Sequence, residues 1–352
     1  MLMLYKVFQL PGTPRKPSML DAETVKDHLD SLAKPPGSLG KLEALAIRLA
    51  VTQGTLKAKT KPRKLLIFAG DHGVVEEGVG IWPSAVTSAM IGVIANGRAS
   101  CSALAACCDT PVALIDVGSM IEAPPGGAIY RDARVARGSG NLAQGHALTP
   151  DQFWAAWMVG EEALNACAKE GCKVVAVGEV GIGNTTAAAC LIALIAQADP
   201  GATVGQGAGS TSVTLAKKHE VVADAVARAI EYTDSDPVTA MAGVAGFEIV
   251  AMAGAIAAAA HAEVTIVLDG VVSAAAALIA ASVDPAALET AIASHTGAEP
   301  AHAIALEKLG LEPFLDWQMR LGEGTGALLL LPMLDAAANL LSGVATLKEV
   351  AG

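Results

Sequence analysis

The sequence is poor in aromatic side chains and has no long apolar run, and each shortage excludes a class of protein. Aromatic residues make up 3% of the 352 residues, against 53% for hydrophobic residues, and alanine and glycine are abundant. This mixture favours closely packed helices over an inner sheet. The most apolar stretch, Ile249–Ala260, has 12 residues, whereas a membrane-spanning helix needs about 20, so we expect a buried core helix and no membrane partner.

Positively charged residues are too few for a protein whose partner is a nucleic acid. The chain has 24 basic and 35 acidic residues, a formal net charge of −11, so a phosphate backbone would be repelled on average. One basic cluster, between Lys57 and Lys64, comes just before an expected strand and is better explained as a solvated linker. We therefore expect no nucleic-acid partner.

Motifs for disulfides and metals are also missing. None of the six cysteines forms a C-x-x-C pair, the seven histidines are dispersed, and H-E-x-x-H does not occur. The first residues, Met1–Lys6, lack the basic start and sustained apolar run of a secretory signal. These absences predict no metal, no cofactor and a cytoplasmic location.

What is present is an alternation of short β-branched runs with long alanine-rich segments. Continuous apolar strands that alternate with helices indicate a parallel sheet covered on both faces, so we predict an α/β fold with a doubly wound, mostly parallel, Rossmann-like sheet. We assign this core to residues 61–326, and a small helical subdomain formed from both chain ends to residues 1–60 and 327–352. The predicted strands are Leu65–Phe68, Val112–Ile115, Val174–Val177 and Val264–Leu268.

The loops that follow these strands carry small or acidic residues. They include Asp71, Asp116, Glu179 and Asp269. In open α/β sheets, ligands bind beyond the carboxyl ends of the strands, so we expect these loops to converge on one site.

Two glycine-rich segments indicate a phosphorylated ligand. The first, Gly178–Thr186, follows a strand and precedes a helix whose N-terminus, capped by Asn184 or Thr185, would favour phosphate. It is neither a Walker A loop nor the G-x-G-x-x-G of dinucleotide folds, so by itself it can equally be a tight turn. The second, Gly205–Ser210, is followed by Lys217-Lys218. The two segments together favour the phosphorylated ligand.

Glu323 stands between two glycines in the segment Arg320–Gly326. Gly322 and Gly324 leave room for a ligand to approach the carboxylate, and an apolar helix begins just after it. A carboxylate at a helix N-terminus can simply interact with the helix dipole. Partial burial beside apolar residues would instead raise its pKa towards neutrality, which suits a general base. The pattern of residues leaves both interpretations open.

Two further pairs, Asp71-His72 and Ser294-His295, look like parts of catalytic triads. No G-x-S-x-G elbow occurs, and no acidic residue can be assigned as the third member. We interpret both pairs as polar groups at strand ends that make loop hydrogen bonds, rather than as nucleophile and base.

An ordered set of motifs resembles the nicotinate-nucleotide:dimethylbenzimidazole phosphoribosyltransferases, which assemble the lower ligand of cobalamin. The matches cover nearly the whole chain, in the expected order. They are Lys34–Gly40, Asp71–Val74 with Glu77–Val79, Asp116–Gly118, Gly138–Asn141, Gly178–Thr186, Leu268–Gly270, Ser294-His295 and Arg320–Gly326.

This resemblance implies transfer of the 5-phosphoribosyl group of nicotinate mononucleotide to 5,6-dimethylbenzimidazole. A ring nitrogen of the acceptor attacks C1′, nicotinate leaves, and the α-ribotide forms. By resemblance, Glu323 is the base that removes the acceptor's extra proton, and Glu179 orients the ribose or assists electrostatically. Family members are homodimers, which implies a homodimer here, with the helical subdomain near the partner's site.

The resemblance also assigns residues to the two substrates. The apolar acceptor pocket is expected between Trp82, Met90 and Leu321. The residues expected around the nucleotide are Gly181, Gly183, Asn184, Thr185, Gly205, Gly207, Lys218, Asp269, Ser294 and Arg320.

The sequence departs from the family's pattern at a few positions. Gly70 stands where alanine is usual, Gly205–Gly209 lacks the arginine that many relatives carry, and Gly297 replaces a common serine. Trp82 occupies a position that varies in the family.

The identity of the acceptor therefore stays open, and another azole, adenine or a phenol are alternatives. A non-catalytic nucleotide-binding module is a further alternative, against which the two glutamates argue. An NAD-dependent oxidoreductase is disfavoured because the dinucleotide fingerprint is missing.

Overall fold

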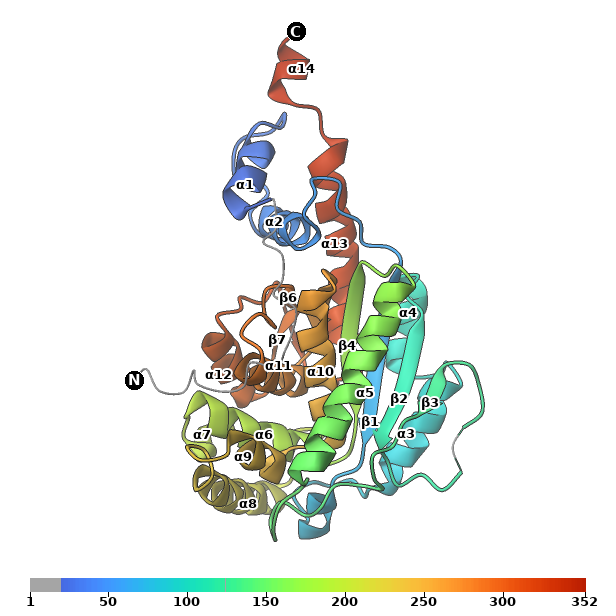
Figure 1. Ribbon diagram of the computed structural model, residues 1–352, viewed down its shortest axis with the longest axis vertical. Helices are drawn as coiled ribbons and strands as arrows, with labels where there is room; N and C mark the ends of the chain where they lie inside the picture. The colour runs from blue at the N-terminus through green and yellow to red at the C-terminus, as the bar shows by residue number, and fades with distance from the viewer. Residues whose placement is uncertain (1–19, 124) are drawn as a thin grey trace.

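The computed structural model describes residues 20–123 and 125–352, and a six-stranded sheet forms its centre (Figure 1). The strands lie in the order β3-β2-β1-β4-β5-β6, and all neighbouring pairs are parallel. This is the strand order of doubly wound, Rossmann-like folds, which confirms the predicted fold class. The strands are β1 Arg63–Gly70, β2 Val112–Gly118, β3 Tyr130–Asp132, β4 Val174–Val180, β5 Thr265–Leu268 and β6 Ala291–Ala293.

The central strands are buried on both faces, which explains why they read as continuous apolar runs. In β1, Leu66 and Phe68 belong to one core, whereas Leu65 and Ile67 belong to the other. Successive side chains of a strand point to opposite faces, so a sheet covered on both sides needs apolar residues at every position.

One face of the sheet is covered by alanine-rich helices that approach one another closely. A Cβ added to Gly160 would lie 1.6 Å from the Ala251 carbonyl oxygen, and one added to Gly254 would lie 2.1 Å from the Trp157 carbonyl oxygen. The contact between α5 and α10 therefore depends on small residues, in agreement with the shortage of aromatic side chains. The helices of this layer are α5 Pro150–Lys169, α6 Asn184–Ala196, α7 Pro200–Thr203, α8 Ser212–Ile230, α9 Pro237–Val244, α10 Phe247–His261, α11 Val271–Val283 and α12 Pro300–Leu309.

Helices from both chain ends pack on the other face. Leu29, Leu49 and Leu334 share one buried core with Ile67 of the sheet. Figure 1 shows α1, α2 and the far end of α13 projecting beyond the sheet. A helical subdomain divided from the core at residues 60 and 326 remains a prediction, and its residues 1–19, with Met1–Lys6, lie outside the described residues. This layer contains α1 Ala22–Asp30, α2 Lys41–Gln53, α3 Ala85–Ala95, α4 Ser100–Cys107 and α13 Thr325–Gly343.

Two stretches, Ala85–Cys107 and Thr325–Gly343, are long and apolar enough to cross a membrane by length and composition. The first is divided into α3 and α4 by a turn that starts at Asn96. The second is α13, whose Leu328 and Leu331 are fully buried against the sheet. Since the core helix of a soluble protein passes the same length test, we interpret α13 as a core helix.

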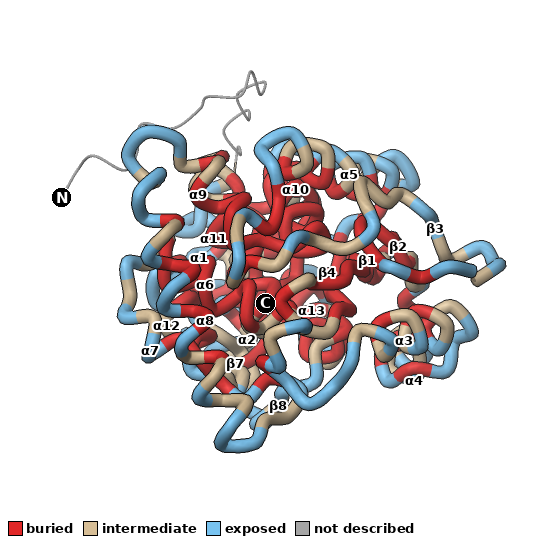
Figure 2. The backbone as a smooth tube through the Cα atoms, turned by 90° about the horizontal axis from the view of Figure 1, so that it is seen from below, coloured by how far each residue is buried: buried red, intermediate tan, exposed pale blue. Residues whose placement is uncertain are grey.

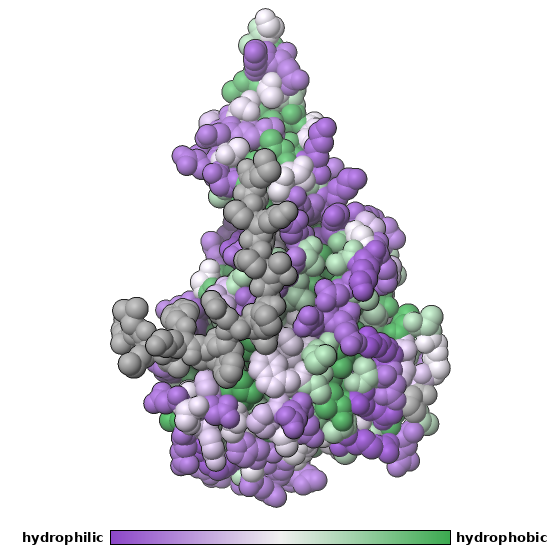
Figure 3. Space-filling view, viewed as in Figure 1, coloured by the Kyte–Doolittle hydropathy of each residue, from purple (hydrophilic) through white to green (hydrophobic). Residues whose placement is uncertain are grey.

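Figure 2 shows buried backbone of α10, α11 and α13 at the centre of the molecule, and Figure 3 shows a largely hydrophilic face.

The smaller elements lie next to the sheet and at the end of the chain. A separate two-stranded parallel sheet pairs β7 with β8. Neither strand was predicted from the sequence. These elements are η1 Gly73–Glu77, β7 His295–Gly297, β8 Leu315–Met319 and α14 Leu347–Ala351.

Candidate active site

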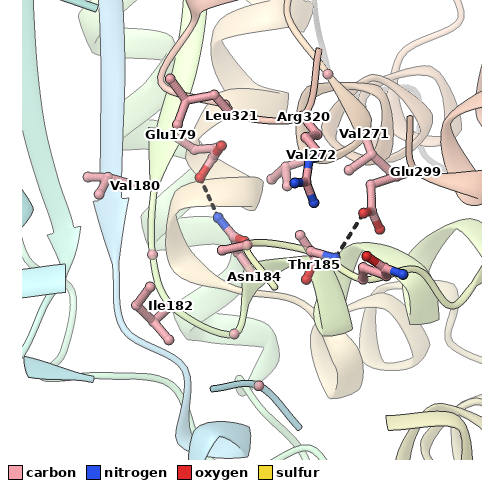
Figure 4. Close-up of a pocket in the computed structure, with 18 of the residues that line it drawn as sticks. Glu179, Val180, Ile182, Asn184, Thr185, Val271, Val272, Glu299, Arg320 and Leu321 are labelled. Atoms are coloured by element: carbon pink, nitrogen blue, oxygen red, sulfur yellow. Dashed lines mark hydrogen bonds between the residues drawn. The ribbon is translucent and has the colours of Figure 1, made fainter. Parts of the chain in front are cut away.

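A cavity of about 410 Å³ opens at the carboxyl ends of the central strands (Figure 4). The strand order reverses between β1 and β4, because β1 is followed outward by β2 on one side and β4 by β5 on the other. Ligands of open α/β sheets bind at such a switch point. The volume lies in the range of small-molecule sites.

The cavity brings together most of the predicted site residues. Gly205 and Ser294 are the exceptions, because neither contributes to the cavity wall. Ser294 is fully buried, and its hydroxyl lies 2.9 Å from Nδ1 of His295, which does line the cavity. The predicted residues that line it are Glu179, Gly181, Gly183, Asn184, Thr185, Gly207, Lys218, Asp269, Arg320 and Glu323, with Trp82, Met90 and Leu321.

Glu323 occupies a left-handed backbone conformation. Its φ is 58°, between Gly322 at 93° and Gly324 at 74°. For a residue with a side chain this conformation costs about 1–2 kcal/mol and is found where the surroundings enforce it, often at functional sites. A Cβ added to Gly178 of β4 would lie 2.3 Å from Gly324 N, and one added to Gly322 would lie 2.4 Å from Glu179 Oε1. The glycines therefore let the segment that carries Glu323 lie directly against β4.

Asp269 holds this segment in place. It follows β5 and is 4% exposed. Its Oδ2 accepts a hydrogen bond from Gly324 N at 3.0 Å, and its Oδ1 accepts one from Gly326 N at 2.7 Å. Burial raises the pKa of Asp269, while His295 and these N–H groups oppose the rise. Asp269 thus caps the first turn of α13, in addition to its predicted place beside the nucleotide.

Glu323 itself is 8% exposed, and its carboxylate lies at the N-terminus of α4. The backbone N–H of Cys101, in the first turn of that helix, donates to Glu323 Oε2 at 3.4 Å. The positive end of the helix dipole thus lies beside the carboxylate. Burial and the neighbouring Glu323 raise the pKa of the Cys101 thiol to about 12, so the thiol stays protonated. The sequence interpretation missed this contact because Cys101 sits in an alanine-rich stretch typical of plain packing.

Glu179 lies at the end of β4 with its carboxyl group facing the same cavity. Burial raises its pKa to about 8, and the negative charges of Asp269, Glu248 and Glu323 add to the rise. The side-chain amide of Asn184 donates a hydrogen bond to it and opposes the rise (Figure 4). A cationic ligand placed among these carboxylates would favour the charged form of Glu179.

The first turn of α6 also faces the cavity. The N-cap is Gly183, with φ 97°, so the prediction that Asn184 or Thr185 caps this helix is wrong. A Cβ on Gly183 would lie 2.9 Å from Val75 Cγ2, which explains why a glycine stands there. Asn184 is instead engaged with Glu179. Asn184 N and Thr186 N donate to the carbonyls of Gly181 and Gly183 at 3.3 and 3.0 Å, but no N-cap side chain covers this helix end. The positive end of the helix dipole therefore faces the cavity, where it favours an anion.

The second glycine segment lies beside this helix end. Lys218 is 2% exposed, and its Nζ donates to Thr185 Oγ1 at 2.9 Å and to the Gly205 carbonyl at 3.0 Å. Burial lowers the pKa of Lys218, and the charge of Glu299 opposes this. Glu299 accepts a hydrogen bond from Gly207 N at 2.8 Å (Figure 4). The sequence interpretation missed Glu299, whose position just before Pro300 reads as an ordinary helix start.

The open side of the cavity is apolar. Trp82 is 47% exposed and Leu321 is 58% exposed, and both line the cavity together with Met90. Trp82 Nε1 donates to the Ala208 carbonyl at 3.4 Å, which links the loop before α3 to the second glycine segment. Exposed aromatic and aliphatic side chains of this kind favour a flat apolar ligand.

The pair Asp71-His72 makes structural hydrogen bonds below the cavity wall. His72 Nε2 lies 2.6 Å from Glu248 Oε1, and both side chains are buried. Asp71 Oδ2 accepts from Met120 N at 2.8 Å. Glu248 is the acidic partner that could not be assigned from the sequence.

Across residues 20–123 and 125–352, no group of three or more His, Cys, Asp or Glu side chains is arranged to hold a metal ion.

Comparison with known proteins identifies the family. A phosphoribosyltransferase family model matches residues 16–351. A nicotinate-nucleotide–dimethylbenzimidazole phosphoribosyltransferase of Thermus thermophilus is 40% identical over 321 residues, which cover 91% of this chain and 95% of that protein. The enzyme of the same name from Salinispora tropica is 41% identical over 337 residues, covering 92% of each chain.

A solved structure agrees with the sequence relatives. The crystal structure of CobT from Thermus thermophilus superposes with a TM-score of 0.90 at 39% identity, covering 94% of this chain and 98% of that one. The chain therefore belongs to this phosphoribosyltransferase family.

Proposed function

We propose that this enzyme transfers the 5-phosphoribosyl group of nicotinate mononucleotide to 5,6-dimethylbenzimidazole, giving α-ribazole phosphate and nicotinate. One observation carries the proposal: the carboxylate of Glu323 shares a cavity with an anion-accepting helix end and an apolar wall. The relatives named for this reaction support it.

The geometry suggests how the substrates are arranged. The 5′-phosphate lies against the first turn of α6 and the second glycine segment, where N–H groups and Lys218 attract an anion. The ribose and the cationic pyridinium lie near Glu179 and Asp269. The acceptor lies between Trp82, Met90 and Leu321.

The chemistry then needs one proton to be removed. A ring nitrogen of the acceptor forms a bond to C1′, and the bond from C1′ to the pyridinium nitrogen breaks. The electron pair of that bond returns to nicotinate, which leaves with a neutral ring nitrogen. The substituted azole carries an extra proton on its other nitrogen, and Glu323 accepts it as general base.

Four points need a test: the acceptor, the oligomeric state, the compartment and catalysis itself. The acceptor wall is exposed, so another azole or a phenol is the alternative substrate. We further propose that the enzyme is a homodimer and works in the cytoplasm, a compartment that agrees with its six free cysteines. A nucleotide-binding module without catalysis is the remaining alternative, and it gives no role to Glu323.

The experiment incubates the protein with nicotinate mononucleotide and a panel of azoles and phenols, and identifies the products by mass spectrometry. We expect nicotinate and one N-ribotide, with dimethylbenzimidazole the best acceptor. Glu323→Gln should slow transfer by about 10²–10⁴-fold, whereas Glu312→Gln, at an exposed position, should not. Absence of nicotinate release with every acceptor would exclude the enzymatic function.

A further inference from the structure

The side chain of Glu299 takes an unusual direction for its place in the fold. Glu299 is the N-cap residue of α12, but its carboxylate makes no capping hydrogen bond to that helix. It reaches across the cavity instead and accepts a hydrogen bond from the backbone N–H of Gly207 at 2.8 Å. The carboxylate thus occupies a donor of the second glycine segment.

That segment is shaped around the carboxylate. A Cβ added to Gly205 would lie 2.0 Å from Glu299 Oε2, and one added to Gly207, whose φ is 56°, would lie 2.7 Å from Thr185 Oγ1. A side chain at either position would push the anion away or strain the turn. Gly205 therefore makes room for the carboxylate of Glu299, and Gly207 lets the turn lie against Thr185.

The charge of the same carboxylate also acts on a buried lysine. Lys218 is almost completely buried, and both of its hydrogen-bond partners, Thr185 Oγ1 and the Gly205 carbonyl, are neutral. Glu299 is the charge that favours the ammonium form of Lys218. A buried cation is stable only when a negative charge lies close to it.

We propose that Glu299 takes the place of the substrate phosphate in the free enzyme, so that the 5′-phosphate must displace it in order to bind. This inference rests on the proposed function, which puts the phosphate at the same N–H group and the same lysine. A phosphate carries about −1.5 to −2 charges near neutral pH. Like charges that compete for one donor repel each other, so the carboxylate and the phosphate cannot occupy the segment together.

The carboxylate of Glu299 makes the site selective for anions that form more binding contacts with the protein than the carboxylate itself forms. A ribotide brings three phosphate oxygens and the binding energy of its ribose and base, and can displace Glu299. Inorganic phosphate brings only its own contacts and is kept out. A riboside without phosphate does not compete with Glu299. The product is again a phosphorylated ribotide, so the return of Glu299 favours its release.

The test compares Glu299→Gln with the unchanged protein by isothermal titration calorimetry. Glutamine keeps the length of the side chain and an oxygen that can accept from Gly207 N, but it removes the charge. We expect inorganic phosphate and nicotinate mononucleotide to bind at least about tenfold more tightly, which corresponds to about 1.4 kcal/mol. Binding of nicotinate riboside should not change. Glu307→Gln, an exposed carboxylate on the same helix, is the matched control and should behave like the unchanged protein.

Two results would overturn the inference. If Glu299→Gln binds phosphate and nucleotide less tightly, Glu299 is a fixed support of the glycine segment. If binding is unchanged, the carboxylate does not compete. Thermal melting of each variant shows whether it is folded. Lys218→Met tests the phosphate position on which the inference rests: if its nucleotide affinity equals that of the unchanged protein, the phosphate does not bind here and the inference fails. The proposed function is tested separately by transfer activity in the product assay, which does not depend on this result.

Discussion

The helices α6 and α13 begin alike at the cavity but offer it opposite chemistry. Each has a left-handed glycine as its N-cap, Gly183 with φ 97° and Gly324 with φ 74°. At α13, the carboxylate of Asp269 already accepts hydrogen bonds from the first N–H groups. At α6, Asn184 N and Thr186 N donate only to the backbone carbonyls of Gly181 and Gly183, and the first turn lines the cavity. One helix end is compensated within the protein, and the other is available to a ligand.

This difference explains why one cavity can hold an anion and a base side by side. The end of α6 is suited to a phosphate because the positive end of its dipole faces the cavity with no carboxylate bound to its N–H groups. The end of α13 has an acceptor, so it fixes the backbone of Glu323 without attracting the phosphate. The first two of four predictions test this contrast directly, and the other two test the carboxylates that share the cavity, from the largest expected effect to the smallest.

Weakening the acceptor that Asp269 provides at the N-terminus of α13 should have the largest effect on the rate. In Asp269→Asn, Gly324 and Gly326 share a weaker, uncharged acceptor, and the segment that carries Glu323 shifts. A misplacement of about 1 Å can cost about 100-fold in rate, and we expect a loss of kcat of this size. Steady-state kinetics measure it. Asp284→Asn, which removes an acid far from the cavity, is the control, and an equal loss in both variants would contradict the account.

The two N-cap glycines provide the most direct comparison. In Gly183→Ala and Gly324→Ala, an alanine is forced into a left-handed conformation, which costs each variant about 1–2 kcal/mol of stability. We expect Gly183→Ala to weaken nucleotide binding about tenfold, because the anion-accepting turn is displaced from the ligand. Gly324→Ala should mainly lower kcat. Calorimetric Kd and kcat separate the two effects, and identical changes in both variants would refute the contrast.

The buried carboxyl group of Glu179, with other carboxylates near it, should make the stability of the protein depend on pH. The pKa of Glu179 is raised to about 8 in the folded protein. The stability that this group contributes is therefore fully present below its pKa in the unfolded chain, and it is lost as the pH rises towards 8. Each pH unit in this window is worth about 1.4 kcal/mol at most. Glu179→Gln should therefore be more stable than the unchanged protein at a pH of about 9 and show a flatter profile. Urea unfolding from mildly acidic to mildly alkaline pH tests this, and parallel profiles would contradict it.

Removing the thiol of Cys101 should have the smallest effect on kcat. The hydrogen bond to Glu323 comes from the backbone N–H of Cys101, and it remains after the side chain is substituted. We expect Cys101→Ala to lower kcat by no more than about threefold, and Cys101→Ser to restore it. Cys108→Ala, at the other end of α4, is the control. A loss as large as that of Asp269→Asn would mean that the Cys101 side chain supports Glu323 as much as Asp269 does, which would contradict this ranking.

The fold could be predicted from the sequence where burial decides it. The run Leu65–Phe68 lies inside β1, because a strand covered on both faces must be apolar throughout. The strand β3, Tyr130–Asp132, was not predicted, because it is a short edge strand whose Arg131 and Asp132 are exposed. Such strands are defined by their pairing partner and not by their own composition.

The site could be predicted only where its chemistry is local. Glu323 and its flanking glycines form one short motif, and so do Gly181 and Gly183. The contacts of Cys101 with Glu323 and of Glu299 with Gly207 join segments that are far apart in sequence. They arise because a parallel sheet brings the ends of distant strands to one edge, and no property of the single residues announces them.

The central claim is that Glu323 removes a proton in the transfer step, and the pH dependence of that step tests it most directly. Single-turnover transfer from nicotinate mononucleotide to dimethylbenzimidazole is measured across the acid range for the unchanged protein and for Glu323→Gln, with bound nucleotide confirmed at each pH. The account predicts that the unchanged protein loses activity as acid protonates one carboxylate, and that the variant is slower by about 10²–10⁴-fold and lacks this loss. A variant that keeps both the rate and the acid-dependent loss would contradict the account.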